Sequence, residues 1–146
     1  MKPVNLVNPV THFMLSQAQA GKILIVDDDI SLVQLSQLIL ADMGYAVRGA
    51  ISGAQALVMI AEDMPDLVLL DVMMPQMNGI ELCRKIRHLY APPVPYILMY
   101  TADDHADTRR HSLNAGANDL VTKDTPIAEL AAKIKNLLTE ILLGEL

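Results

Sequence analysis

Aromatic residues and cysteine are scarce in this chain of 146 residues. It has no tryptophan, aromatic residues make up 3% of it, and Cys83 is its single cysteine. A lone cysteine allows neither a disulfide framework nor a cysteine-based metal site, as expected in a reducing compartment. We therefore expect a cytoplasmic protein whose core is built from Leu, Ile, Val, Ala and the nine Met.

Clusters of positive charge and long apolar runs are also lacking. The net charge is −6, and the absence of a Lys/Arg cluster argues against binding nucleic acid or an anionic membrane. No apolar run approaches the ~18 residues of a spanning helix. Residues 1–21 show no helical or strand period and no signal-peptide core, so we expect a tail or packing arm there. The domain itself is expected over 22–143, with 144–146 as a short C-terminal end.

Short apolar runs alternate with longer mixed segments through the domain. The runs at 23–26 and 67–70 have no polar face, which is typical of strands buried on both sides of a parallel sheet. Strands are expected at 23–26, 46–50, 67–70, 96–100 and 120–121, and helices over about 29–42, 52–61, 79–89, 103–115 and 126–143. This (βα)₅ order predicts a single doubly wound α/β domain, with one parallel five-stranded sheet and helices on both faces. The weaker strand at 46–50 is expected at an edge.

Apolar spacing predicts which helix faces pack on the sheet. The inward positions are expected to be Leu32, Leu35, Ile39 and Met43 in the first helix, and Leu82, Ile86 and Leu89 in the third. The helix at 103–115 has few apolar residues, so it should be loosely held. In the last helix the surplus residues Leu138, Leu142 and Leu143 favour self-association.

Polar residues follow four of the expected strands. They are Asp27 and Asp28, Asp71, Thr101 and Lys123. The ends of parallel strands meet at one edge of the sheet, where three close carboxylates repel by about 4 kcal/mol per pair at 4 Å and an effective dielectric near 20. Oxygen ligands without His or Cys suit Mg²⁺, which points to phosphoryl chemistry with Asp71 as nucleophile and Lys123 and Thr101 contacting the phosphoryl oxygens.

Each of these residues alone has a structural explanation. The acids at 27–29 would cap a helix, Asp71 would form a turn, and a strand-end threonine or a solvated lysine is common. The coincidence at four strand ends favours the functional interpretation.

Four motifs together resemble a bacterial response-regulator receiver domain. They are Ile23-Leu-Ile-Val-Asp-Asp-Asp, Leu67-Val-Leu-Leu-Asp-Val-Met-Met-Pro-x-Met-Asn-Gly, Tyr100-Thr-Ala and Ala115-Gly-Ala-Asn-Asp-Leu-Val-Thr-Lys. The resemblance covers Lys22 to about Leu143 and implies strand order 2-1-3-4-5. It also implies a phosphorylation-dependent signalling switch, with autodephosphorylation and no separate enzyme activity.

The resemblance assigns roles to the strand-end residues. Asp71 would accept phosphate from a histidine kinase or phosphotransfer protein, and Thr101 and Lys123 would grip the phosphoryl group. Asp28, Asp71 and the Met73 carbonyl would ligate Mg²⁺, or Mn²⁺ in its place, with Asp27 acting through water. The phosphorylated domain would act on a downstream protein or output domain, or form a homodimer, through the fourth and fifth helices and the fifth strand.

Two positions depart from the family pattern. Leu120 stands where an aromatic ring usually changes rotamer with the threonine, and Tyr100 is a weak candidate to replace it. Asp124 stands where a proline usually follows the lysine, so we expect a trans Lys123–Asp124 bond with the Asp124 carboxylate near the ammonium or in solvent.

Three other functions fit the sequence less well. A phosphorylation-independent interaction or dimerisation module would keep the fold, but it would not need every acid. A haloacid-dehalogenase-type phosphatase needs a second Asp where Met73 stands, and a dinucleotide-binding domain needs a Gly-x-Gly-x-x-Gly run after the first strand.

Overall fold

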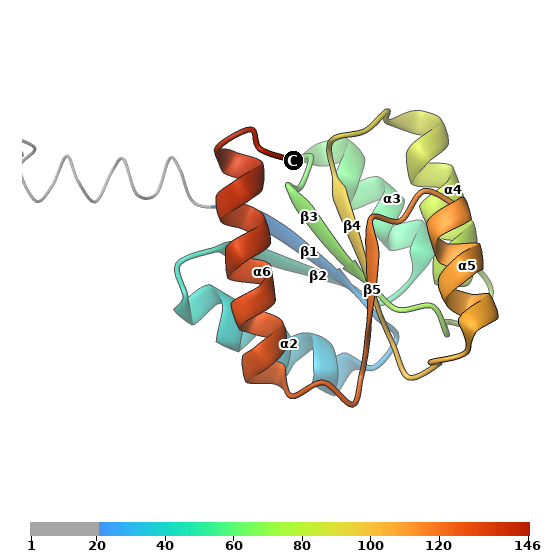
Figure 1. Ribbon diagram of the computed structural model, residues 1–146, viewed down its shortest axis with the longest axis horizontal. Helices are drawn as coiled ribbons and strands as arrows, with labels where there is room; N and C mark the ends of the chain where they lie inside the picture. The colour runs from blue at the N-terminus through green and yellow to red at the C-terminus, as the bar shows by residue number, and fades with distance from the viewer. Residues whose placement is uncertain (1–20) are drawn as a thin grey trace, which may run out of the picture.

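The computed structural model describes residues 21–146, so the tail or arm expected over 1–21 lies, apart from Gly21, outside the described residues. These residues form a five-stranded parallel sheet with strand order β2-β1-β3-β4-β5 (Figure 1). The strands are β1 (Lys22–Val26), β2 (Ala46–Ala50), β3 (Leu67–Leu70), β4 (Tyr96–Thr101) and β5 (Asp119–Thr122). The helices are α2 (Ile30–Asp42), α3 (Gly53–Glu62), α4 (Gly79–Leu89), α5 (Ala106–Asn114) and α6 (Ile127–Leu142). The predicted fold class, strand order and edge position of residues 46–50 are confirmed.

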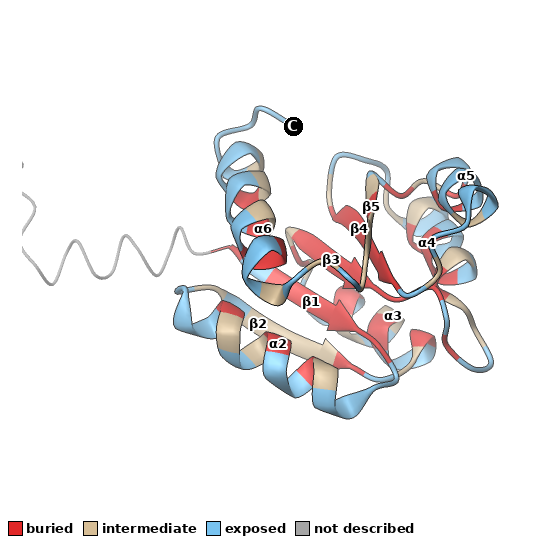
Figure 2. Cartoon of the chain, turned by 60° about the horizontal axis from the view of Figure 1, so that its bottom comes forward, coloured by how far each residue is buried: buried red, intermediate tan, exposed pale blue. Residues whose placement is uncertain are grey.

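The sheet separates two apolar layers (Figures 1 and 2). Alternate residues of each central strand point to opposite faces, so β1 places Leu24 in the layer shared with α3 and α4, and Ile25 in the layer shared with α2 and α6. All four residues of β3 are buried, as the uninterrupted apolar run predicted. No helix among residues 21–146 is both long enough and apolar enough to cross a membrane.

Side chains cap the first three helices at their N-termini. Asp29 accepts the Leu32 N–H at 3.2 Å, and Asn78 accepts the Glu81 N–H at 2.9 Å. The Ser52 hydroxyl accepts the Gln55 N–H at 3.2 Å. The Asp29 carboxylate therefore caps the N-terminus of α2.

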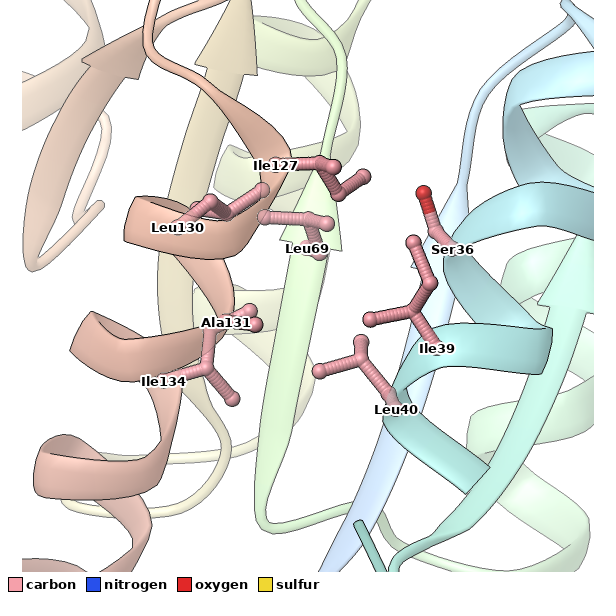
Figure 3. A pocket seen from close by; sticks show the side chains of 8 residues that line it. All are labelled: Ser36, Ile39, Leu40, Leu69, Ile127, Leu130, Ala131 and Ile134. Atoms are coloured by element: carbon pink, nitrogen blue, oxygen red, sulfur yellow. The ribbon is translucent and has the colours of Figure 1, made fainter. Parts of the chain in front are cut away.

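The prediction for the inward face of α2 was wrong in part. Leu35 and Met43 are exposed, whereas Val33, Ser36 and Leu40 are buried. Apolar residues occur on nearly every side of this helix, so spacing alone did not fix which stripe packs on the sheet. The helix rotates a serine inward, where its hydroxyl lines a small hollow between α2 and α6 and has no hydrogen-bond partner (Figure 3).

Two further apolar positions were misplaced. Leu89 ends α4 and is 60% exposed, whereas Leu82, Cys83 and Ile86 of the same helix are buried. Leu138 is fully buried against the sheet, so it cannot contribute to self-association; Leu142 and Leu143 are exposed at the end of α6.

Helix α5 begins at Ala106, three residues later than expected. The Asp103 carboxylate accepts the His105 N–H at 3.0 Å and the Thr108 hydroxyl at 2.6 Å, which forms a turn before the helix. The hydrogen bonds from the Thr108 hydroxyl and the His105 N–H hold the pKa of Asp103 at about 2. The His105 ring also contacts this carboxylate. Ser112 is the one buried residue within α5, which agrees with its few apolar residues.

Candidate functional site

The carboxyl ends of β1 and β3 hold two acids side by side. Val26 and Leu70 are paired across the two strands, and the next residue of each strand is an aspartate. The Asp71 N–H continues the ladder to the Val26 carbonyl at 2.9 Å, and the Asp27 N–H bonds to the Ala50 carbonyl at 3.1 Å. Both aspartates are therefore fixed by backbone hydrogen bonds at the edge of the sheet.

The structure brings three of the predicted acids together. Carboxylate oxygens of Asp27, Asp28 and Asp71 all lie within 4.8 Å of one another. Asp27 and Asp71 are buried, at 3% and 4% exposure, whereas Asp28 is exposed. The cluster thus has a buried side and a side open to solvent.

Lys123 reaches the buried side of the cluster from the end of β5. Its Nζ lies 2.8 Å from Asp27 Oδ2 and 3.5 Å from Asp71 Oδ2. Burial favours the neutral amine, but the hydrogen bond and charge of Asp27, with those of Asp71, outweigh burial and raise the pKa of Lys123. The lysine is therefore a fixed cation between two buried acids.

Asp71 is the acid with unused acceptor capacity. Burial and the neighbouring charge of Asp27 raise its pKa, and Lys123 and the Met73 N–H offset only part of that rise. Its Oδ1 atom is buried without a hydrogen-bond partner. A buried, unpaired carboxylate oxygen is costly, so this atom is suited to receive a ligand.

The donor set fits a hard divalent cation. Three carboxylates converge with no His or Cys among them, and Asp71 Oδ1 is free to coordinate. Both oxygens of Asp27 already accept hydrogen bonds, one from the Asp29 N–H and one from Lys123. No donor among residues 21–146 reaches the Met73 carbonyl.

Thr101 lies at the end of β4 and is completely buried. Its carbonyl accepts the Lys123 N–H at 2.8 Å, and its hydroxyl accepts the Asp103 N–H at 3.3 Å. The structure therefore couples Thr101 to the Lys123 backbone, while its hydroxyl makes no hydrogen bond to Asp71.

Gly79 is a positioning residue whose role was missed at the level of sequence. A Cβ at this position would lie 2.0 Å from the Asp71 carbonyl oxygen, so only glycine lets the first turn of α4 approach the strand end this closely. The Gly79 N–H bonds to the Val72 carbonyl at 2.9 Å. The Asn78-Gly79 pair just after the acidic strand end was the available signal.

Tyr100 cannot replace the missing ring at Leu120. Leu120 packs in the layer with α3 and α4, whereas Tyr100 packs in the opposite layer with α2 and α6. The sheet separates the two side chains. Tyr100 instead lies under the lysine, with 6.0 Å between Lys123 Nζ and the ring centroid.

The trans geometry expected at Lys123–Asp124 is confirmed, because the cis bonds among residues 21–146 are Pro92–Pro93 and Val94–Pro95. The Asp124 carboxylate accepts the Thr122 hydroxyl, and Lys123 pairs with Asp27 and Asp71. Asp124 therefore does not compete for the Lys123 ammonium in this structure, although that was one of the two arrangements expected from sequence.

Comparisons with known proteins identify the family of this fold. The family model described as response regulator receiver domain matches residues 23–135. Response regulator MprA of Mycobacterium tuberculosis is 42% identical over 117 residues, which cover 80% of this chain and 50% of that protein; the protein of the same name from Mycobacterium leprae has the same identity and coverage.

Two solved structures have the same fold. A CheY-like receiver domain protein from Methanospirillum hungatei JF-1 superposes with a TM-score of 0.77 at 33% identity, covering 84% of this chain and 96% of that one. The BeF3-activated N-terminal receiver domain of Klebsiella pneumoniae RstA gives a TM-score of 0.73 at 35% identity, covering 80% and 97%.

The chain belongs to the response regulator receiver domain family. It is a module of two-component signalling, the class in which a receiver domain works as a phosphorylation-dependent switch. Receiver domains generally bind Mg²⁺ at an acidic pocket, and this chain has the corresponding cluster of aspartates. The chain spans about half the length of the curated relatives it matches.

Proposed function

We propose that Asp71 is the phosphoryl acceptor of this receiver domain, in a unit that spans residues 22–143. The observation that carries the proposal is the Asp71 carboxylate itself. One of its oxygens lies 3.5 Å from the Lys123 ammonium and the other is buried without a partner. No other acid of the cluster combines a free oxygen with a buried cation.

The transfer needs one bond to form and one to break. An Asp71 oxygen attacks the phosphorus of a phosphohistidine, the new P–O bond forms as the P–N bond breaks, and the leaving imidazole takes a proton from solvent. Lys123 would move from its carboxylate partners to the phosphoryl oxygens, and the Thr101 hydroxyl would donate a second contact. Attack of water on phosphorus would break the P–O bond to Asp71, releasing inorganic phosphate and restoring the carboxylate. The domain would then catalyse both its phosphorylation and its dephosphorylation.

The aspartate cluster would hold Mg²⁺, or Mn²⁺ in its place. Asp28, Asp71 and the Met73 carbonyl would be direct ligands, and Asp27 would act through water because both of its oxygens already accept hydrogen bonds. When bound, the ion supplies positive charge against the carboxylates and the phosphoryl oxygens.

The partners follow from the same chemistry. The phosphoryl donor would be a histidine kinase or a phosphotransfer protein of the cytoplasm, and the output would be a downstream protein or an output domain. We place the output surface, and any homodimer contact, on α5, β5 and α6. A groove of about 340 Å³ lies there, between Arg109 of α5 and Lys133 of α6.

Intact-mass spectrometry with acetyl phosphate or phosphoramidate tests the proposal. With Mg²⁺ the chain should gain one phosphoryl group, and Asp71→Asn should gain none. Asp104→Asn, which removes an exposed acid outside the cluster, is the matched control and should be labelled like the wild type. Labelling that survives in Asp71→Asn, or that is undiminished in EDTA, would contradict the assignment.

A further inference from the structure

A second groove lies between α3 and α4, outside the aspartate cluster. It has a volume of about 390 Å³ and is lined by Leu57, Arg84, Lys85, His88 and Leu89. Helix α4 starts at the Asp71 strand end and runs away from it, so this groove lies toward the opposite edge of the sheet (Figures 1 and 2).

Exposed apolar side chains occur on both helices that form the groove. Leu89 is 60% exposed on α4, and Val58 is 57% exposed on α3, one residue after the groove-lining Leu57. Neither Leu89 nor Val58 contributes to the buried core. Of these two, Leu89 lines the groove itself, opposite Leu57, and exposed apolar side chains gathered at a groove mark binding surfaces more often than isolated ones do.

The rim carries cations that the protein itself leaves unpaired. Among the Lys and Arg residues from 21 to 146, Arg84, Lys85 and Lys135 are those whose side chains make neither an ion pair nor a hydrogen bond. Two of the three lie side by side on this groove, together with His88. The net charge of the whole chain is −6, so this local excess of positive charge is opposite in sign to the charge of the chain as a whole.

We propose that the α3–α4 groove is a docking site for an acidic amphipathic helix of a partner protein. Apolar side chains spaced three and four residues apart would lie on Leu57 and Leu89, and carboxylates beside them would pair with Arg84 and Lys85. The inference goes beyond the phosphoryl-transfer proposal, because it uses none of the residues at the aspartate cluster.

Other occupants match the groove less well. It is open and no buried polar group converges on it, unlike an enclosed small-molecule site. Two adjacent cations and a histidine are too few for a nucleic-acid footprint on an acidic chain. An acidic helix satisfies both the apolar floor and the charged rim.

The test uses the full-length chain, labelled with ¹⁵N, and a synthetic peptide about four helical turns long. The peptide has one leucine stripe flanked by glutamates; one control peptide replaces the glutamates with lysines and another scrambles the stripe. We expect amide shifts confined to α3 and to residues 84–89 with the acidic peptide, and none with either control. Raising the ionic strength should weaken binding.

Matched variants separate the groove from general charge. Lys85→Glu should weaken peptide binding about tenfold, whereas Lys135→Glu, with the same charge change on α6, should have little effect. Leu89→Ser should also weaken it about tenfold, while Leu38→Ser removes an exposed leucine of α2 and should not. Phosphoryl labelling should be normal in Lys85→Glu, so failure of this inference is distinguishable from failure of the proposed transfer.

Several outcomes would overturn the inference. They are equal binding of the acidic and lysine peptides, shifts that map to the groove over β5, equal losses in Lys85→Glu and Lys135→Glu, and no binding of any peptide. Self-association of the chain that Lys85→Glu abolishes would make a second copy the occupant and would equally refute an acidic helix.

Discussion

Replacing Asp71 by asparagine should stabilise the protein in the absence of divalent cations. Each acid–acid pair of the cluster, with oxygens within 4.8 Å, repels by about 3.5 kcal/mol at an effective dielectric near 20. At 3.5 Å, Lys123 attracts Asp71 by about 4.7 kcal/mol on the same scale. Asp71 is therefore repelled by two acids more than it is attracted by its one cation.

The expected gain is about 1 to 2 kcal/mol, because Asp28 is exposed and its repulsion is screened. For a domain of this size the gain corresponds to a rise in Tm of about 4 to 8 °C. Asp27→Asn should gain less stability, because Asp27 Oδ2 lies only 2.8 Å from Lys123 Nζ and the substitution removes this stronger attraction. Thermal and urea unfolding in EDTA, followed by circular dichroism, measure both variants against the wild type.

The pH dependence of the gain follows from the raised pKa of Asp71. Below the pKa of an unfolded aspartate, about 3.9, the carboxyl is neutral in both states and the repulsion is absent. As pH rises, Asp71 ionises less readily in the folded state than in the unfolded chain. The destabilisation is complete once the pH exceeds the raised pKa of Asp71 in the folded state. The advantage of Asp71→Asn should therefore be complete at neutral pH and fade toward pH 4.

Mg²⁺ should reverse the order of stability. At a hundredfold excess over its Kd, the ion adds about 2.7 kcal/mol to a protein that binds it only when folded. The wild type should gain this amount and Asp71→Asn much less. An asparagine variant that is less stable than the wild type in EDTA, or that gains as much from Mg²⁺, would refute the electrostatic account of the cluster.

Three more predictions follow from other contacts in the structure. Asp28→Asn should lose more Mg²⁺ affinity in calorimetric titration than Asp29→Asn, because Asp29 caps α2; equal losses would show that the ligands are misplaced. Cys83 is fully buried and burial raises its pKa to about 11, so it should not react with a thiol reagent until the protein unfolds, and rapid labelling in the native state would contradict this. Asp103→Ala should speed hydrogen exchange in α5 while leaving α6 unchanged, because the carboxylate organises the turn before α5; unchanged rates in α5 would show that packing holds it instead.

The sheet was predictable from sequence because its signals are redundant. Four apolar residues in a row at 67–70 have no polar face, and they are followed by an acid at the strand end. The face of α2 was not predictable in the same way. With apolar residues on most sides, the choice between Leu35 and the buried Ser36 depends on how α6 packs against the helix, which no local spacing encodes.

The candidate site likewise has one part that the sequence predicts and another that it does not. The meeting of Asp27, Asp28 and Asp71 follows from the parallel sheet alone, so strand ends in the sequence were enough to predict it. The close approach at Gly79 could not be predicted in this way, because a glycine at the start of a helix does not reveal that a Cβ there would lie 2.0 Å from the Asp71 carbonyl oxygen.

The ionic contacts of β5 offer a physical link between the lysine and the two helices beside it. Lys123 directly follows this strand, and its N–H is bonded to the Thr101 carbonyl of β4. Asp119 begins the strand and is paired with Arg109 of α5 at 3.5 Å and with Lys133 of α6 at 2.9 Å. Under the proposed function, a movement of Lys123 toward a phosphoryl group would act on a strand only four residues long, whose far end contacts both helices. This arrangement requires no ring at the position of Leu120, since the contacts are made by charged groups along the strand.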